Sequence, residues 1–469
     1  MTTPSPRVVV VGGGISGLTA ALAVSRGLPA AVVTVVEASP SIGGKLVSAE
    51  VAGITVDAGA ESVLARRPEA LDLFGEVGLA EQVVYPGVSG AGILVDGTMR
   101  ALPRRQLLGI PWDLRDLAAS GVISSTGLLR IPLDHLLPRT PVGEDISVGE
   151  LVAARLGREV VDRLVEPLLG GVYAGHADEL SLGATLPDVL ARMRTDRSLL
   201  SAVAAVRVPP ADDAPVFASL RGGLGRLPAA VAAASGANVL LGTPVERVDR
   251  VETGWLVSAG PHHLPADAVI LAVPAAAAAT LLAPLAAVAA SLLAQVDYAS
   301  VALVTYVFPR SAFDRLPSGT GFLVPPHEER VVKAATYASL KWPWVASEHP
   351  DRVVLRASVG RHRDEVDLAR DDDDLAWAAL GELATVTGVR DAPLAQLVTR
   401  WDAALPQYAV GHPGRVATVR EGVARFPTLA VCGAALDGVG IPACIASGRA
   451  AAAQVAEALR ATGQWGNDG

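Results

Sequence analysis

A strand, a glycine turn and a helix open this chain, and this stretch constrains the fold more than any other. An apolar β-branched run at residues 8–11 leads into Gly12, Gly14 and Gly17 in G-x-G-x-x-G spacing, and the helix-compatible run LTAALAVSRG follows. Gly12 permits the turn, Gly14 leaves no side chain between the backbone and a pyrophosphate, and Gly17 allows close packing of helix on strand. The motif therefore predicts a nucleotide-binding unit whose phosphates lie at the helix N-terminus.

The residues after this unit indicate which dinucleotide it binds. A second β-branched run at residues 31–36 ends in Glu37, where an acidic side chain accepts hydrogen bonds from a ribose. A further glycine pair, Gly43-Gly44, follows at once. An ordinary NAD-binding unit does not need this pair, whereas the longer cofactor FAD accounts for it. We therefore expect FAD, held without a covalent bond.

The combination of G-x-G-x-x-G, Glu37-Ala38 and Gly43-Gly44-Lys45 resembles the flavin amine oxidase and protoporphyrinogen oxidase superfamily. Two later strings, EPLLGGVYAG from Glu166 and SLRGGLGRL from Ser219, resemble those of the bacterial protoporphyrinogen and coproporphyrinogen oxidases. The resemblance covers nearly the whole chain. It implies an α/β fold, with a Rossmann-type FAD-binding domain in the p-hydroxybenzoate hydroxylase-like arrangement, an α+β substrate domain and a helical subdomain.

A length of 469 residues is enough for roughly three domains. We expect a discontinuous FAD-binding domain at residues 1–75, 216–275 and 395–469, a substrate-binding domain at 76–95 and 276–394, and a helical subdomain at 96–215. Residues from about 96 to 206 show helical periodicity broken by prolines. The runs VALVTYVF, VVKAATYASL and RVVLRASVGR are predicted to be strands of one antiparallel sheet.

The resemblance also implies which residues bind FAD. The hairpin at residues 51–62, here called the flavin hairpin, passes the flavin ring, the backbone of Val245 contacts adenine, and Trp401 lies beside the isoalloxazine. The N-terminus of the last helix faces the flavin pyrimidine edge, where reduced flavin carries negative charge. The predicted FAD-binding set is Gly12, Gly13, Gly14, Ile15, Ser16, Gly17, Glu37, Ala38, Gly44, Lys45, Gly59, Ala60, Glu61, Ser62, Val245, Trp401, Gly433, Gly440, Ile441 and Pro442.

Candidate substrate residues are Arg66, Arg67, Leu169 and Gly171. The two arginines leave the flavin hairpin, where they face either water or an anionic substrate. His176 is a catalytic candidate, but a lone histidine beside an aspartate is more often a hydrogen-bonded loop residue. The sequence contains no convincing acid–base constellation, so no catalytic residue is assigned. No metal site is predicted.

Only one G-x-G-x-x-G occurs, so the substrate itself must reduce the flavin. The resemblance implies oxidation of coproporphyrinogen III to coproporphyrin III, with three hydride transfers to FAD, dioxygen as acceptor and hydrogen peroxide as product. Protoporphyrinogen IX is the alternative substrate, since it carries two propionates where coproporphyrinogen III carries four. More distant alternatives are an amine oxidase, a carotenoid desaturase, and a non-catalytic binding protein on the same fold. A downstream ferrochelatase is a possible partner.

Composition and charge indicate which partners and which cellular compartment to expect. The net charge of −9 and the absence of basic runs longer than a pair argue against nucleic acid. Two cysteines without C-x-x-C spacing, and a start that lacks a signal-peptide pattern, favour the cytoplasm. The apolar passage 268–294 is predicted to be a buried strand and then helices, because two prolines interrupt it. The segment LPRRQLLGIPWDLRDL either lies on a membrane surface or belongs to the helical subdomain, and we favour the second.

Overall fold

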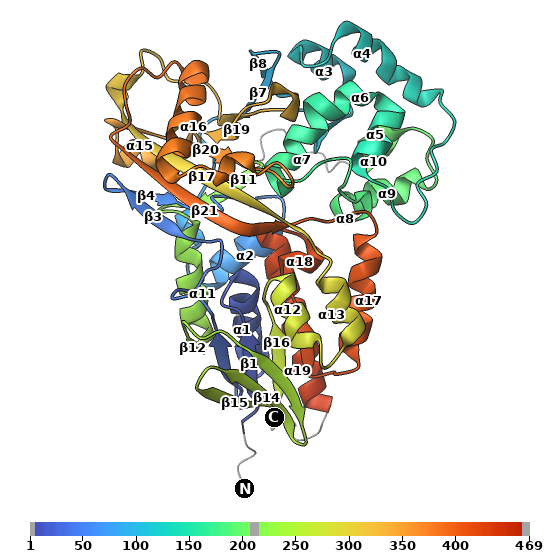
Figure 1. Cartoon of the computed structure of the whole chain (residues 1–469), viewed down its shortest axis with the longest axis vertical. Coiled ribbons are helices and arrows are strands. Elements are labelled where there is room, and N and C mark those ends of the chain that lie inside the picture. The colour runs from blue at the N-terminus through green and yellow to red at the C-terminus, as the bar shows by residue number, and fades with distance from the viewer. Residues whose placement is uncertain (1–4, 207–214, 462–469) are drawn as a thin grey trace.

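The computed structural model describes residues 5–206 and 215–461 and arranges them in three regions (Figure 1). The lower region in the view contains a parallel sheet with helices, the upper left region contains a broad sheet, and the upper right region is helical. The fold class expected from the sequence is confirmed. Two of the predicted domain limits, residues 1 and 469, lie outside the described residues. Residues 207–214, at the end of the predicted helical subdomain, also lie outside them.

A parallel sheet of strand order β12–β2–β1–β16–β22 forms the centre of the lower region. The valines of β1 and β16 are buried, as strands covered on both faces require. Distant parts of the chain return to this one sheet. Its strands are β1 (Arg7–Val11), β2 (Val32–Val36), β12 (Asn238–Leu240), β16 (Ala268–Leu271) and β22 (Leu429–Val431).

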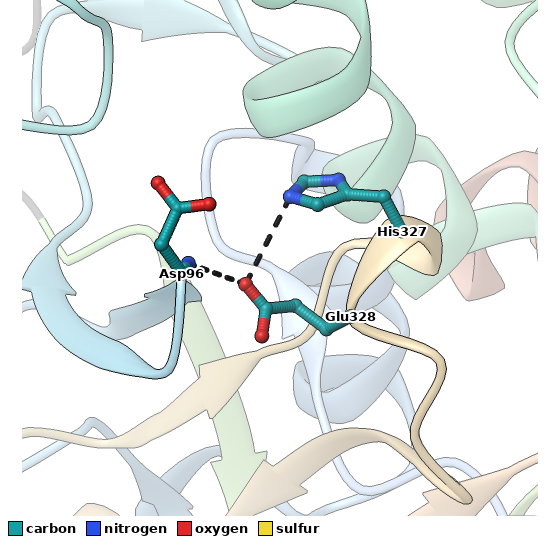
Figure 2. A group of neighbouring side chains, drawn as sticks. All are labelled: Asp96, His327 and Glu328. Atoms are coloured by element: carbon teal, nitrogen blue, oxygen red, sulfur yellow. Dashed lines mark hydrogen bonds and ion pairs between the residues drawn. The ribbon is translucent and has the colours of Figure 1, made fainter.

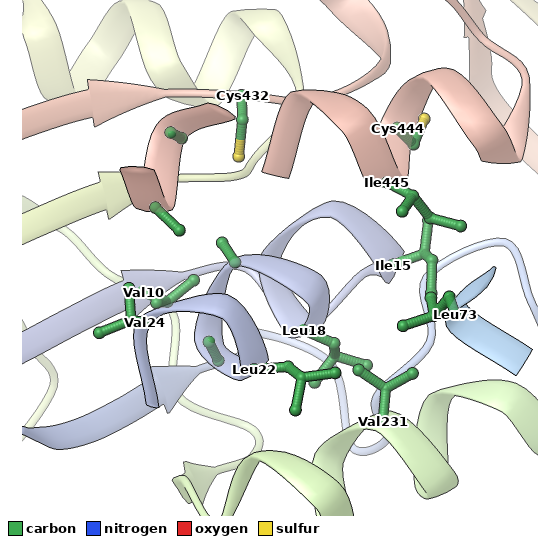
Figure 3. Close-up of a cluster of buried hydrophobic side chains, with 14 of the residues drawn as sticks. Val10, Ile15, Leu18, Leu22, Val24, Leu73, Val231, Cys432, Cys444 and Ile445 are labelled. Carbon is green, nitrogen blue, oxygen red and sulfur yellow. The ribbon is translucent and has the colours of Figure 1, made fainter. Parts of the chain in front are cut away.

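Different elements cover the two faces of this sheet. On one face α1 and α19 pack together, with Ile15 and Leu18 in the same apolar cluster as Ile445 (Figure 3). On the other face, Trp255 of a small antiparallel sheet and three helices form a second cluster. The first face carries α1 (Ile15–Gly27), α2 (Pro68–Glu76), α11 (Leu227–Ser235) and α19 (Ile441–Ala461). The second carries β13 (Arg247–Val251), β14 (Gly254–Ala259), β15 (His262–Ala266), α12 (Ala275–Leu282), α13 (Ala287–Leu293) and α17 (His412–Ala424).

The broad sheet has the order β21–β17–β20–β19–β18–β7–β8, and its pairs are antiparallel except β18 with β7. The predicted strands are present, but the run VVKAATYASL is a strand only as far as Thr336, and residues 338–341 form a helical turn. Short apolar runs fit either periodicity, so the sequence alone misplaced this boundary. The strands are β7 (Gly92–Val95), β8 (Thr98–Ala101), β17 (Tyr298–Pro309), β18 (Gly321–Leu323), β19 (Val332–Thr336), β20 (Arg352–Val359) and β21 (Ala395–Pro406), and the helices beside them are α14 (Ala338–Lys341), α15 (Pro343–Glu348) and α16 (Asp372–Thr387).

Helices dominate the third region, but they begin later than predicted. Strand β8 extends the broad sheet to residue 101, and two short strands follow, so the expectation of helix from about residue 96 was wrong. Prolines 103 and 111 and the positive φ of Leu108 and Gly109 prevent a helix there. The elements are β9 (Gln106–Leu107), β10 (Ile110–Pro111), α3 (Leu114–Ser120), α4 (Ser125–Arg130), α5 (Val148–Leu156), α6 (Arg158–Val160), α7 (Glu166–Tyr173), α8 (Leu182–Thr185), α9 (Pro187–Met193) and α10 (Leu199–Val206).

Two small sheets join the regions. A hairpin of β3 and β4 leads toward the broad sheet, and β11 pairs with β5 on one edge and β6 on the other. These strands are β3 (Ser48–Val51), β4 (Ile54–Asp57), β5 (Val63–Leu64), β6 (Val83–Val84) and β11 (Phe217–Leu220).

The structure shows how the two segments with a membrane interpretation pack. Residues 268–294 form buried β16 followed by α12 and α13, as predicted. In the other segment Trp112 packs against the helical core and Arg105 pairs with Asp113. Across residues 5–206 and 215–461, every helix is too short or too polar to cross a membrane.

Candidate functional site

The glycine turn between β1 and α1 has the geometry that phosphate binding requires. Gly12 has φ +107°, and a side chain on it would overlap the carbonyl oxygen of Ala272. A side chain on Gly17 would overlap the Gly12 carbonyl oxygen, so helix and turn touch backbone to backbone. A Cβ on Gly14 would instead meet no atom within 4 Å. Open space therefore lies in front of the α1 N-terminus, where a pyrophosphate is stabilised by free N–H groups.

Glu37, at the end of β2, lies directly beside this turn. Its carboxylate accepts hydrogen bonds from the backbone N–H of Gly13 at 2.6 Å and of Ser39 at 2.7 Å. Its own backbone N–H and C=O bond to Leu240 and Thr243, which fixes the segment leading to Val245 alongside it. A carboxylate accepts about four hydrogen bonds, so two positions remain for ribose hydroxyls.

The second glycine pair, Gly43-Gly44, packs against the glycine turn between β1 and α1. Gly43 donates its backbone N–H to the Gly13 carbonyl oxygen at 2.8 Å, and the backbone of Gly14 bridges to that of Gly43. Lys45, two residues on, is exposed, yet desolvation by the surrounding protein lowers the pKa of its ammonium. The second glycine pair thus lies directly against the dinucleotide turn, where the longer cofactor FAD would extend past it.

The last helix brings a second N-terminus to the same place. The Gly433 N–H donates to Ser447 Oγ at 3.1 Å, and Ser447 donates to Asp437 at 2.6 Å, which ties the turn before α19 to the helix. A side chain on Gly448 would overlap the Ser16 carbonyl oxygen, so α19 lies against α1 without intervening atoms. Helix α19 begins at Ile441 and Pro442, directly after Gly440. Two helix N-termini thus face one region, where they favour negative charge.

The flavin hairpin and Trp401 are in contact, as expected from the sequence. The Trp401 indole N–H donates to the Ala58 carbonyl oxygen at 2.9 Å, and its ring lies 3.2 Å from where a Gly59 Cβ would be. The Ala60 N–H donates to the Lys45 carbonyl oxygen at 3.0 Å. The structure therefore brings together residues that are about 350 positions apart in sequence, and they fit the isoalloxazine end of FAD. Their roles stay predictions.

Glu61 is the charged centre of this hairpin, and the sequence did not reveal its partners. Its buried carboxylate pairs with Lys341 Nζ at 2.6 Å and with Arg356 Nη2 at 3.0 Å. Arg356 also donates to the carbonyl oxygens of Asp57 and Gly59, at 2.9 and 3.0 Å. Burial raises the pKa of Glu61, but Arg356 and Lys341 outweigh it and the net shift is downward.

Both cations are recognisable in the sequence as unusual charges. Arg356 follows the apolar run VVL in the strand RVVLRASV, and Lys341 is one of only three lysines in the chain. A charge within an apolar strand needs a partner. Which partner it finds is decided by the fold, because the two cations lie on β20 and α14 of the broad sheet and Glu61 lies on the flavin hairpin.

The predicted substrate residues have different environments. Leu169 is fully buried in α7. Gly171 on the same helix is exposed, and a Cβ built on it would lie 3.4 Å from the Leu323 side chain. Arg67 pairs with Glu69 at 2.6 Å and is half exposed, and Arg66 is exposed too. Substrate contact by these four residues stays a prediction.

His176 is hydrogen-bonded, as favoured from the sequence, but not to the neighbouring Asp178. Its Nδ1 lies 2.6 Å from Glu166 Oε1, and its Nε2 lies 2.9 Å from the His362 carbonyl oxygen. The Glu166 hydrogen bond raises the pKa of His176. Asp178 pairs instead with Arg158. These residues line a surface cavity of about 630 Å³ between the helical region and the broad sheet.

Figure 2 shows the residues whose types most resemble a metal centre, Asp96, His327 and Glu328. Their ligand atoms lie within 4.8 Å of one another. The Glu328 carboxylate accepts from the Asp96 backbone N–H and lies 3.8 Å from His327, while the Asp96 carboxylate pairs with Arg163 at 3.0 Å. Each carboxylate therefore has partners within the protein.

Comparisons with known proteins agree with this geometry. The family described as flavin containing amine oxidoreductase matches residues 15–456. A protein from Mycobacterium bovis named coproporphyrinogen III oxidase is 39% identical over 96% of this chain and 98% of its own length. A protein of the same name from Bacillus subtilis is 33% identical with the same coverage. The crystal structure of a proposed protoporphyrinogen oxidase from Exiguobacterium sp. 255-15 has a TM-score of 0.86 and 32% identity, covering 97% of this chain and 99% of the other.

Proposed function

Because the chain belongs to the flavin-containing amine oxidoreductase family, we propose that it is an FAD-dependent oxidase of coproporphyrinogen III. The observation that carries the proposal is its similarity, over nearly the full length of both chains, to relatives named coproporphyrinogen III oxidase. The geometry supports it, because the glycine turn, Glu37 and two helix N-termini form a cradle that fits FAD beside the broad sheet.

The proposed reaction removes six electrons and yields coproporphyrin III, with dioxygen as acceptor and hydrogen peroxide as product. FAD, when bound, supplies the redox chemistry by accepting an electron pair in each of three rounds. The chain's own residues bind and orient. Helices α1 and α19 direct their N-termini at the cofactor's negative charges, and Arg356 holds the carbonyl oxygens of Asp57 and Gly59 in place through hydrogen bonds. Reaction then depends on placement of the substrate, since a pyrrole nitrogen loses its proton readily once the electron pair has left.

The proposal includes the predicted FAD-binding and substrate-binding residues. It also includes a downstream ferrochelatase as a partner and a cytoplasmic location. Cys432 and Cys444 are both free and buried, which fits a reducing compartment. The second candidate substrate is protoporphyrinogen IX, which is favoured by the similarity to the Exiguobacterium protein.

The test is a comparison of the two porphyrinogens with purified protein in air. We expect a yellow protein that releases FAD on acid treatment and shows a higher kcat/KM for coproporphyrinogen III, measured by porphyrin fluorescence. Three molecules of hydrogen peroxide should form per porphyrin, and NADPH should not stimulate turnover. A preference for protoporphyrinogen IX would refute the substrate assignment, and a colourless protein that cannot be reconstituted with FAD would refute the whole proposal.

A further inference from the structure

Two cations are buried beneath helix α7, and neither forms an ion pair with any residue in the described part of the chain. Lys333 on β19 is 7% exposed and Arg361, just after β20, is 4% exposed. Arg361 donates its Nη2 to the Val324 carbonyl oxygen, while its Nη1 is buried and has no hydrogen-bond partner. Among the residues that the structure describes, none forms a hydrogen bond or an ion pair with the Lys333 ammonium.

This arrangement is electrostatically incomplete. Removing an ammonium and a guanidinium from water is unfavourable unless each gains a partner, and like charges placed together add to the penalty. Burial and the nearby Arg361 lower the pKa of Lys333 to about 7. Glu166 and Asp364 act on Arg361 at longer range, but the Glu166 carboxylate is already engaged by His176 and by the Ala177 backbone N–H. An incoming anion would complete the cluster.

The local backbone places these side chains close to α7, the helix that carries the predicted substrate residues Leu169 and Gly171. The register of β19 against β20 shifts between Val332 and Ala334, so Lys333 is the extra residue of a β-bulge, a device that re-aims a side chain. Arg361 Nη1 lies 3.4 Å from the position that a Cβ on Gly170 would take. Gly171, the next residue of α7, lies against Leu323 on the neighbouring strand β18.

The cluster also lies at a suitable separation from the flavin hairpin. Thr336 on β19 pairs with Arg356, whose guanidinium bonds to Gly59 and Glu61. Lys333 is three residues from Thr336, or about 10 Å along an extended strand. A tetrapyrrole with one bridge at the flavin and a propionate arm extended spans a comparable distance.

We propose that Lys333 and Arg361 form a buried anion site that binds one propionate carboxylate of the substrate and favours a tetracarboxylate porphyrinogen over a dicarboxylate one. The assignment rests on the proposed function and names residues that set its specificity. Lys333 supplies a charge-assisted hydrogen bond, and the free Nη1 of Arg361 supplies a second donor to the same carboxylate.

The test is the variant Lys333→Met, which removes the charge and keeps a long apolar stem, with Arg363→Met as the control. Arg363 lies two residues from Arg361, but it is exposed and paired with Glu179. We expect Lys333→Met to raise KM for coproporphyrinogen III by about ten- to a hundredfold, with a smaller rise for protoporphyrinogen IX. The control should change neither KM. FAD content and kcat should stay the same in both variants.

A second measurement is independent of turnover. The binding of coproporphyrin III, the fluorescent product, to the holoprotein should weaken in Lys333→Met and not in Arg363→Met. The melting temperature of Lys333→Met should not fall, because the variant removes an unpaired buried charge.

An unchanged KM for coproporphyrinogen III, an equal rise for both porphyrinogens, or a lowered melting temperature with unchanged product binding would overturn the inference while the proposed function stands. If the wild-type protein oxidised neither porphyrinogen, the proposed function itself would fail and this inference with it.

Discussion

The ion pairs of Glu61 lead to the prediction that tests the structure most directly. Replacing Glu61 with Gln keeps the shape of the side chain but removes the carboxylate that pairs with both Lys341 and Arg356. These two side chains are 10% and 13% exposed, so both charges would stay largely desolvated. Breaking a buried pair by removing one partner costs about 3–5 kcal/mol. Unfolding entropy of about 2.1 cal/mol/K per residue amounts to about 1 kcal/mol/K for a chain of this length. We therefore expect Tm to fall by about 3–5 °C if the chain unfolds as one unit.

The assay is thermal unfolding followed by far-UV circular dichroism and by the rise in flavin fluorescence as FAD is released. Glu348→Gln is the matched control, because Glu348 pairs with Arg221 at the surface, where both side chains are well exposed. Exposed pairs contribute at most about 1 kcal/mol, so the control should lower Tm by no more than about 1 °C.

A double variant separates charge from packing. Adding Lys341→Met to Glu61→Gln removes one of the two unpaired cations, so the double variant should regain part of the stability lost in the single one. Two results would show that the Glu61 carboxylate does not stabilise the protein through these cations. One is a Tm for Glu61→Gln equal to that of Glu348→Gln. The other is a Tm for the double variant below that of Glu61→Gln alone.

Three further predictions concern the cofactor, the substrate and pH. Glu37→Ala should weaken FAD binding by about 1–3 kcal/mol, measured as the Kd of the apo-protein for FAD, and a Kd equal to that of wild type would mean that the carboxylate does not bind the ribose. Arg67→Ala should raise KM for coproporphyrinogen III by less than about tenfold in the fluorescence assay, because the guanidinium is half exposed and shared with Glu69, and a larger rise would contradict this. Burial raises the pKa of Asp57 to about 6, so the folded protein holds this proton more tightly than the unfolded chain and loses stability as pH rises from about 4 to about 6. Asp57→Asn should therefore gain up to about 3 kcal/mol in unfolding free energy over wild type between pH 4 and pH 8, measured by urea unfolding, and a difference that does not vary with pH would refute the assignment.

The sequence alone was sufficient for the nucleotide-binding half because its determinants are local. Gly12 has a positive φ that other residues rarely adopt, Gly17 leaves room for the Gly12 carbonyl oxygen, and Gly14 leaves the space in front of the helix open. The buried β-branched runs on either side are typical of strands in a covered sheet. The family resemblance then extended this reading to the fold class and the cofactor. Neither step required knowledge of which distant residues touch.

The tertiary structure decided everything that depends on contact between distant segments. Glu61 meets Lys341 across 280 residues, and His176 bonds to Glu166 and not to the aspartate beside it. The β-bulge that carries Lys333 follows from the register of two strands, which no local pattern specifies. Charged side chains have little local preference and are satisfied by whichever partner the fold places within reach. For this reason the glycine turn could be recognised from the sequence, whereas the buried charges could be assigned only after the sheets were assembled.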